Sequence, residues 1–208
     1  MKRYIAVVCL LLCALPIVSS AQSDSLLDRF YRNMASSCMG MDIKYSIQMP
    51  GVKVDGSGML EFQDEQWHLN GNGIEMWCDG RSVWTIDADA KEVVIDKVSN
   101  DNASELMANP AILLIRINEF FRLKETVPGK DGKSLIYIMY PKSESYVSFV
   151  NLEISKSDAS LRKTEFSLDD GTSVVVNVSA VKLMKKKPAD YFSRPVKYDS
   201  SWIVTDLR

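Results

Sequence analysis

The sequence predicts a mainly β fold of the α+β class, in which one large antiparallel sheet curls into an incomplete barrel. Three observations lead to this prediction. Apolar and polar residues alternate along about ten segments, as they do in strands with one buried face. Turn-forming pairs such as Pro50-Gly51, Asp79-Gly80 and Asp170-Gly171 separate several of these segments. Only two segments have helical spacing, so we expect helices to cover the open face of a curved sheet.

The first residues have the pattern of a secretory signal peptide. Lys2 and Arg3 precede the apolar run Tyr4–Val18, and Ser19–Ala21 supplies the small residues that signal peptidase needs. The apolar run is too short to span a membrane. We therefore expect cleavage after Ala21, a single exported domain over residues 22–208, and a bacterial periplasm as its compartment.

The first helix is expected between Ser23 and Ala35, with Ser23 or Asp24 as its N-cap. One apolar stripe at three-to-four spacing supports it, formed by Leu26, Leu27, Phe30, Tyr31 and Met34. The period then changes to two, and the residues from Ile43 to Met49 alternate as in a half-buried strand.

An antiparallel meander is expected next. Its strands carry Leu60 and Phe62, then Trp67 and Leu69, and continue with Ile74–Cys78, Val83–Asp87 and Glu92–Asp96. Asp79-Gly80 turns the chain between two of these strands. Trp77 and Trp84 should therefore pair across one hairpin, where cross-strand aromatic pairs stabilise a sheet.

A second, strongly apolar helix is expected from Leu106 to Leu123, with Asn109 and Pro110 suited to its N-cap and first turn. Alternation resumes after Ser134 and predicts the remaining strands at Leu135–Tyr140, Val147–Ser155, Leu161–Leu168, Thr172–Leu183 and Trp202–Leu207.

Residues that carry chemistry are scarce. The chain has 25 basic and 27 acidic residues and a net charge of −2, so it lacks the broad basic character typical of nucleic-acid-binding proteins. His68 is the single histidine, and alternation turns it away from Trp67 and Leu69 onto a face where we expect it to be exposed. No nucleophile motif or phosphate-binding glycine loop accompanies it. We therefore predict no enzyme activity, no metal site and no cofactor.

Cys38 and Cys78 are the cysteines of the expected mature domain. An oxidising compartment permits a disulfide between them, and two separate buried thiols are the alternative. No CxxC pair is present, so a thiol redox motif is not predicted.

Apolar side chains are abundant, including ten methionines, seven phenylalanines and four tryptophans. They could form an ordinary filled core, or they could line a cavity for a lipid chain inside the curved sheet. Alternation does not decide which face of the sheet lines such a cavity. The candidate lining residues are Ile43, Tyr45, Ile47, Leu60, Phe62, Met76, Trp84, Ile86, Leu113, Ile117, Phe120 and Phe121.

One part of the chain resembles a known family. Gly58–Phe62, Trp67 and Met76–Asp87 resemble the "G-x-L … sDGktlWxYd" core of the periplasmic outer-membrane lipoprotein carriers, the LolA family. Glu92–Ile95 and Asn109–Leu113 extend the similarity. The C-terminal residues from Val204 to Arg208 resemble the Bacteroidetes type.

The resemblance implies an incomplete barrel with a helical lid over a hydrophobic cavity. It also implies a monomeric carrier that takes acylated lipoproteins or lipid from an inner-membrane ABC lipoprotein-release complex to an outer-membrane acceptor. The family often has a basic K-R-P stretch that helps to hold its lid shut. This chain has Gln63-Asp64-Glu65-Gln66 there, so another contact must hold a closed lid.

The resemblance leads to one expectation for the lid, the helix around Ile112–Phe121. A charged substitution at Leu113 or Ile117 should abolish lipid binding and leave the sheet folded. A sensor of envelope lipids or lipoproteins, or another interaction module of the same fold, is the alternative function. A lipid or glycan hydrolase is disfavoured, because the single histidine has no nucleophile motif beside it.

Overall fold

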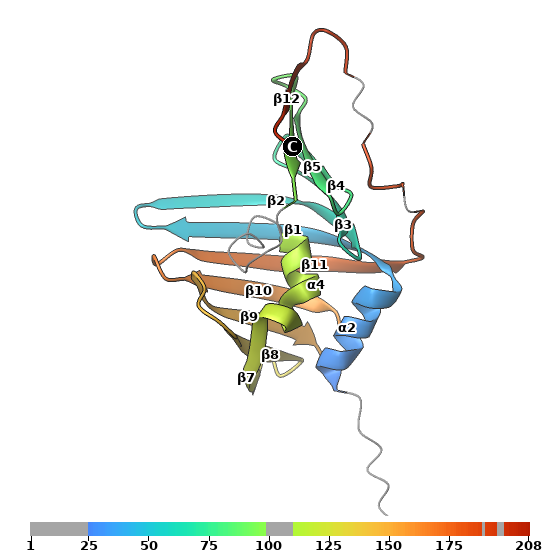
Figure 1. The fold of residues 1–208 in the computed structure, drawn as a ribbon. Coiled ribbons are helices and arrows are strands. Elements are labelled where there is room, and N and C mark those ends of the chain that lie inside the picture. Colours follow the sequence, from blue (N-terminus) through green and yellow to red (C-terminus); the bar gives the residue numbers. More distant parts are fainter. Residues whose placement is uncertain (1–24, 99–109, 189, 195–197) are drawn as a thin grey trace, which may run out of the picture.

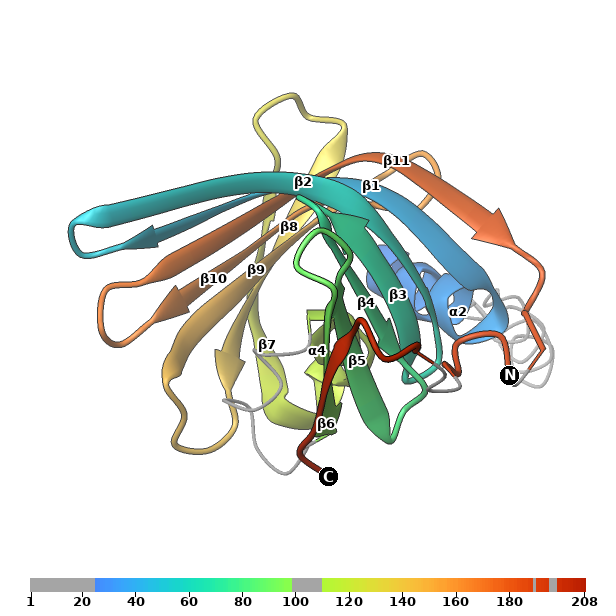
Figure 2. The same ribbon diagram turned by 90° about the horizontal axis from the view of Figure 1, so that it is seen from above.

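The computed structural model describes residues 25–98, 110–188, 190–194 and 198–208. The expected signal peptide and the first part of the expected second helix lie outside these residues. Twelve strands in the described part of the chain form one sheet, in the order β12-β6-β5-β4-β3-β2-β1-β11-β10-β9-β8-β7. The sheet is strongly curved and open, and it arches over two helices that lie against its concave face (Figures 1 and 2). The predicted fold class is confirmed.

The strands of the first half of the sheet are β1 (Cys38–Met49), β2 (Val52–Gln63), β3 (Gln66–Gly71), β4 (Ile74–Cys78), β5 (Ser82–Asp87) and β6 (Glu92–Lys97). Those of the second half are β7 (Phe121–Pro128), β8 (Ser134–Pro141), β9 (Val147–Ser155), β10 (Leu161–Leu168) and β11 (Ser173–Met184). Each half is an antiparallel meander, and the pairing of β1 with β11 joins the two. The last strand, β12 (Ile203–Asp206), lies parallel to β6 at one edge.

Helix α2 (Leu26–Ser36) begins later than the sequence predicts. Ser25 is its N-cap, and not Ser23 or Asp24. The Asp28 backbone N–H donates to Ser25 Oγ at 3.1 Å, and the Asp28 carboxylate accepts from the Ser25 N–H at 3.3 Å. This reciprocal pair is a capping box, which satisfies two N–H groups at the start of the helix. The buried residues Leu27, Phe30 and Met34 pack into the main core.

Helix α4 (Pro110–Phe120) ends three residues earlier than predicted, and strand β7 follows it directly. The apolar residues Phe121 and Leu123 fit the helical spacing, which is why the sequence extends the helix through them. In the structure, Phe121 instead pairs with Pro141 of β8. The Lys142 N–H donates to the Phe120 carbonyl at 2.8 Å, and its ammonium donates to the Asn118 carbonyl at 2.6 Å. These long-range contacts satisfy carbonyl groups that a helix end leaves free.

The two faces of the sheet carry separate cores. The main core lies on the concave face and includes Phe62, Trp67 and Cys78, which the strand register places side by side. A second core lies on the opposite face. It consists of Cys38, Trp77, Trp84, Ile86, Val93, Ile95 and Phe192. Trp77 and Trp84 are partners in the β4–β5 ladder, as predicted.

The same register separates the two cysteines. Met39 pairs with Phe62, Phe62 with Trp67, and Trp67 with Cys78, so these four side chains share the concave face. Cys38 precedes Met39 and therefore points to the other face. Both thiols are free and buried, and the disulfide that the sequence permits is absent. Burial and the neighbouring Glu61 raise the pKa of the Cys38 thiol to about 11, which keeps it protonated and unreactive at neutral pH.

Within the described residues, neither helix has the length and apolar character needed to cross a membrane.

Candidate functional site

An apolar cavity of about 300 Å³ lies against the concave face of the sheet. It is lined by residues of four neighbouring strands, of β3 and of helix α4. They are Met41, Ile43, Tyr45, Ile47, Leu60, Leu69, Leu114, Leu161, Thr164, Phe166, Val174, Val176 and Val178. All but Thr164 and the tyrosine hydroxyl present carbon atoms to the cavity, which is the composition typical of a site for an apolar ligand.

Strand alternation and register bring these residues together. Ile43, Tyr45 and Ile47 are two residues apart on β1 and therefore point to one face. Their partners on β11 are Val178, Val176 and Val174 in the same order. Val176 in turn pairs with Thr164 of β10, and Val174 pairs with Phe166. The result is a continuous apolar floor three strands wide.

The β1 side chains on this floor are only half-buried, although they face the concave side. Elsewhere on that side the main core is closed, and Phe62, Ile117 and Phe121 are 2% exposed or less. An apolar floor that no protein atoms fill is what distinguishes a cavity from a packed core.

The structure divides the predicted lining residues into four groups. Ile43, Tyr45, Ile47 and Leu60 line the cavity. Phe62, Met76, Ile117, Phe120 and Phe121 pack in or against the adjoining main core. Trp84 and Ile86 lie in the second core on the opposite face, so their prediction as lining residues is corrected. Leu113 lies in α4, but its side chain is outside the described residues.

Trp84 and Ile86 were assigned to the wrong face because β5 is apolar at alternate positions that point away from the cavity. The strand reads Ser82 to Asp87, and its buried positions are Ser82, Trp84 and Ile86. The C-terminal segment covers them, with Phe192 fully buried among them. A sequence pattern alone cannot show that a distant segment buries the outer face.

Sequence reasoning missed the β10 and β11 side of the cavity. Val174, Val176 and Val178 alternate regularly and could have been found from this signal. Leu161 and Thr164 line the same cavity although they are three residues apart, because a register irregularity lies between Leu161 and Lys163. Such a bulge changes the phase of the alternation, so a strict period of two hides that Leu161 and Thr164 share a face.

The stretch Gln63-Asp64-Glu65-Gln66 contacts a C-terminal strap, which we define as residues 185–188 and 190–194. The Lys187 N–H donates to Gln63 Oε1 at 2.6 Å, and Gln63 Nε2 donates to the Lys187 carbonyl at 3.2 Å. Lys186 forms an ion pair with Asp64 at 2.8 Å. Gln63 and Asp64 therefore hold the strap against the end of β2.

An aromatic and charged stack fixes the same strap to the outer face of β3 and β4. The His68 ring stacks on Trp77 with 3.6 Å between centroids, and the Arg194 guanidinium lies 3.7 Å from the Trp77 centroid. The Glu75 carboxylate is 3.0 Å from His68 Nε2 and 3.7 Å from an Arg194 nitrogen. His68 is therefore mostly buried, and not exposed as predicted, since its side chain is 12% exposed.

His68 should make stability depend on pH. Burial lowers its pKa below the usual 6.5, and Glu75 only partly opposes this effect. The unfolded chain takes up the proton near its normal pKa, so protonation favours unfolding. We expect the free energy of unfolding to be constant above about pH 6.5 and to fall as the pH drops towards 5, before carboxylates titrate. Urea denaturation at a series of pH values would measure the effect.

His68→Gln is the matched control for this prediction, because it removes the titrating group and keeps a polar side chain. A variant whose stability falls equally between pH 6.5 and 5 would show that another group causes the dependence.

One comparison with a solved structure supports the fold. An uncharacterized conserved protein from Thermus thermophilus superposes with a TM-score of 0.54 at 14% identity, over 89% of this chain and 99% of that one. A LolA superfamily protein from Nitrosomonas europaea gives a TM-score of 0.45 at 13% identity, over 82% and 97% of the two chains. A search of the curated proteins finds no matching sequence. The model of the family described as outer membrane lipoprotein carrier protein LolA matches residues 66–195, more than half of the chain, and the chain therefore belongs to the LolA family.

Proposed function

We propose that this protein is a non-enzymatic carrier that binds the acyl chains of lipoproteins in its apolar cavity and moves them between membranes of the cell envelope. The observation that carries this proposal is the half-exposed apolar floor of β1 and β11 inside a LolA-family fold. A cavity in this position does not stabilise the fold, because the side chains around an unfilled apolar volume lose packing contacts.

The size of the cavity indicates how much of a ligand it can hold. At about 300 Å³ it has twice the volume of the ~150 Å³ cavity that accommodates benzene, so it can hold about a dozen carbon atoms. Burying that many methylenes contributes about 10 kcal/mol, at about 0.8 kcal/mol each. This energy suffices to shield one acyl chain, and it makes unaided release slow.

Release and larger cargo both require the cavity to open. A lipoprotein with three acyl chains exceeds the volume available beneath α4. Among the α4 side chains that the structure describes, Leu114 lines the cavity, so outward movement of this helix would enlarge the cavity and expose its floor. We propose α4 as the lid, in a cycle that begins at an inner-membrane ABC lipoprotein-release complex and ends at an outer-membrane acceptor.

The site of action follows from the expected signal peptide. Residues 1–21 have the charge, apolar run and small-residue end of a secretory signal, and we propose that the domain of residues 22–208 acts as a monomer in the periplasm.

Filling the cavity should abolish most acyl binding. Val176→Trp places an indole between Tyr45 and Thr164, where Val176 pairs with both. If it displaces about three methylenes, affinity for a fluorescent fatty-acyl probe should weaken about fifty-fold. Fluorescence titration of the purified domain would measure the change.

Val175→Trp is the matched control, because the neighbouring residue on β11 points to the other face. This variant should bind the probe as the wild type does. Equal binding by both variants, or no binding by the wild type, would contradict the carrier proposal. In that case a sensor or interaction module would be the better assignment, and native mass spectrometry of the protein from its own cell envelope would identify the partner.

A further inference from the structure

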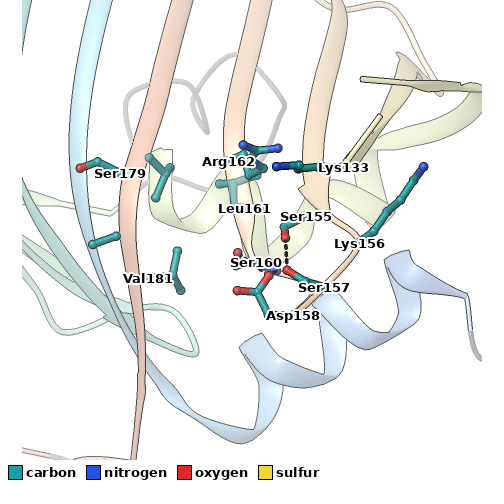
Figure 3. Close-up of a pocket in the computed structure, with 12 residues that line it drawn as sticks. Lys133, Ser155, Lys156, Ser157, Asp158, Ser160, Leu161, Arg162, Ser179 and Val181 are labelled. Atoms are coloured by element: carbon teal, nitrogen blue, oxygen red, sulfur yellow. Dashed lines mark hydrogen bonds between the residues drawn. The ribbon is translucent and has the colours of Figure 1, made fainter. Parts of the chain in front are cut away.

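A second pocket, of about 680 Å³, opens at the end of the sheet where β10 and β11 separate (Figure 3). Its walls come from β11 on one side and from the residues around the β9–β10 turn on the other. They include Ser155, Lys156, Ser157 and Asp158 of the turn, together with Lys133 and Arg162. Unlike the apolar cavity, this pocket is lined mainly by hydroxyl and charged groups.

The pocket exists because the β10–β11 ladder stops early. Strand pairing extends from Ser167–Ser173 to Lys163–Asn177. Beyond Asn177, β11 continues to Met184 and, within the described residues, pairs with β1 alone. At the same level β10 pairs with β9 through Leu161 and Ile154. The wall of the barrel is therefore open between the two strands.

Cations and carboxylates are equal in number around this opening. Lys133, Lys156, Arg162 and Asp158 line it, and Asp131 and Glu153 lie close enough to act on Arg162. Arg162 is held by Asp131 outside the lining at 2.8 Å, and the Lys156 ammonium donates to the Gly132 carbonyl at 2.8 Å. The Lys133 ammonium forms no hydrogen bond or ion pair with any described residue, and Figure 3 shows its side chain directed into the opening. Figure 3 shows the Lys156 side chain turned away from the opening. Lys133 and the hydroxyls of Ser155 and Ser157 therefore supply the donors suited to a phosphate or carboxylate.

The polar pocket adjoins the apolar cavity. Leu161 and Val178 line both, so the two pockets meet at these side chains. A ligand with a charged end and an apolar chain could occupy both by passing between β10 and β11.

One buried hydroxyl lies on this path. Thr164 lines the apolar cavity and is 2% exposed, and its Oγ1 has no hydrogen-bond partner among the described residues. A buried hydroxyl without a partner destabilises a protein, because it has lost its hydrogen bonds to water. The carbonyl oxygen of a bound acyl group would supply the missing acceptor.

We propose that the opening between β10 and β11 binds an anionic amphiphile. The phosphate of its headgroup lies beside Lys133 and the hydroxyls of Ser155 and Ser157, its acyl carbonyl accepts from Thr164, and its chain extends along the β1–β11 floor. The proposal rests on the proposed function, since it requires the cavity to accept an acyl chain. It adds a headgroup site and a direction for the ligand.

Two lipids that differ only in the phosphate test the headgroup site. They are a monoacylglycerol and the lysophosphatidic acid with the same acyl chain, each used below its critical micelle concentration to displace a fluorescent probe. We expect the wild type to bind lysophosphatidic acid about tenfold more tightly, and this preference to shrink with added salt. The variant Lys133→Gln should lose the preference and bind monoacylglycerol unchanged.

Lys97→Gln is the matched control, because it removes one exposed positive charge on β6, away from the opening. This variant should keep the wild-type preference. Equal wild-type affinity for the two lipids, or an equal loss of preference in the two variants, would overturn the headgroup site and leave the carrier proposal standing. Failure of the wild type to bind either lipid would overturn both proposals.

Inorganic phosphate distinguishes a lipid headgroup from a free anion. We expect millimolar phosphate to compete only weakly with lysophosphatidic acid. Phosphate binding as tight as that of lysophosphatidic acid would instead assign the pocket to the free anion.

Thr164→Val tests the carbonyl contact. It should weaken binding of both lipids about fivefold, while it raises the urea midpoint of the ligand-free protein because an unpaired hydroxyl is removed. A raised midpoint with unchanged lipid binding would overturn the contact and show that the hydroxyl has no ligand.

Discussion

Ile117→Asp is expected to prevent folding, and not merely to block the cavity. Ile117 is completely buried in the main core, whereas Leu114, within the described part of α4, lines the cavity. The substitution removes a buried aliphatic side chain and places a carboxyl group in apolar surroundings. Together these changes should lower the free energy of unfolding by at least about 5 kcal/mol, which is comparable to the entire stability of many domains. Circular dichroism and size-exclusion chromatography of the purified variant would detect the loss of the fold.

Two other substitutions provide controls. Ile117→Val keeps the core apolar and should cost about 1 kcal/mol. Leu123→Asp makes the same kind of change on β7, where Leu123 is 49% exposed, and should alter stability by only about 0.5 kcal/mol. If Ile117→Asp unfolds at the wild-type urea concentration but binds no lipid, the sequence-based expectation for Ile117 is correct and the packing described above is wrong.

Trp77→Ala should cause the second large loss of stability, of about 3–5 kcal/mol. Trp77 is 6% exposed and contributes the central ring of the stack between His68 and Arg194. The substitution opens a cavity in the second core and removes a cation–π contact of about 0.5–2 kcal/mol. Urea denaturation followed by circular dichroism would measure the change in the free energy of unfolding.

Limited proteolysis provides a second readout for this variant. The C-terminal strap loses its ring and cation–π contacts with β4 when Trp77 is removed, so it should be cut faster than in the wild type. Tyr146→Ala is the control, because Tyr146 is 71% exposed and should change stability by no more than about 0.5 kcal/mol. Wild-type stability and proteolytic resistance in Trp77→Ala would show that the second core contributes little to the fold.

The periodicity of the sequence predicted most elements and their order. Strands β9 and β10 have the bounds that alternation predicts, because each strand has one buried face along its length and is flanked by polar turns. Long-range pairing determined the elements that differ. Cys38–Asp42 extend β1 because β11 and β2 pair with them on both sides. Phe121–Leu123 form a strand because β8 lies beside them.

The cavity was predicted less completely than the fold. Ile43, Tyr45, Ile47 and Leu60 were found because they alternate on strands of the first half of the sheet. Alternation predicted Trp84 and Ile86 in the same way. It shows that every second residue is apolar, but it does not show whether that face of the strand borders the cavity or another core.

By itself, the sequence determined the secondary structure, the curved antiparallel sheet and the family, because local periodicity and turn chemistry depend on neighbouring residues. Tertiary structure alone decided which face encloses the cavity, why the two cysteines remain apart, and where β10 and β11 separate. These features depend on strand register and on the C-terminal strap, which buries the outer face from more than a hundred positions away in the chain. Contacts between residues so distant leave no periodic signal in the sequence.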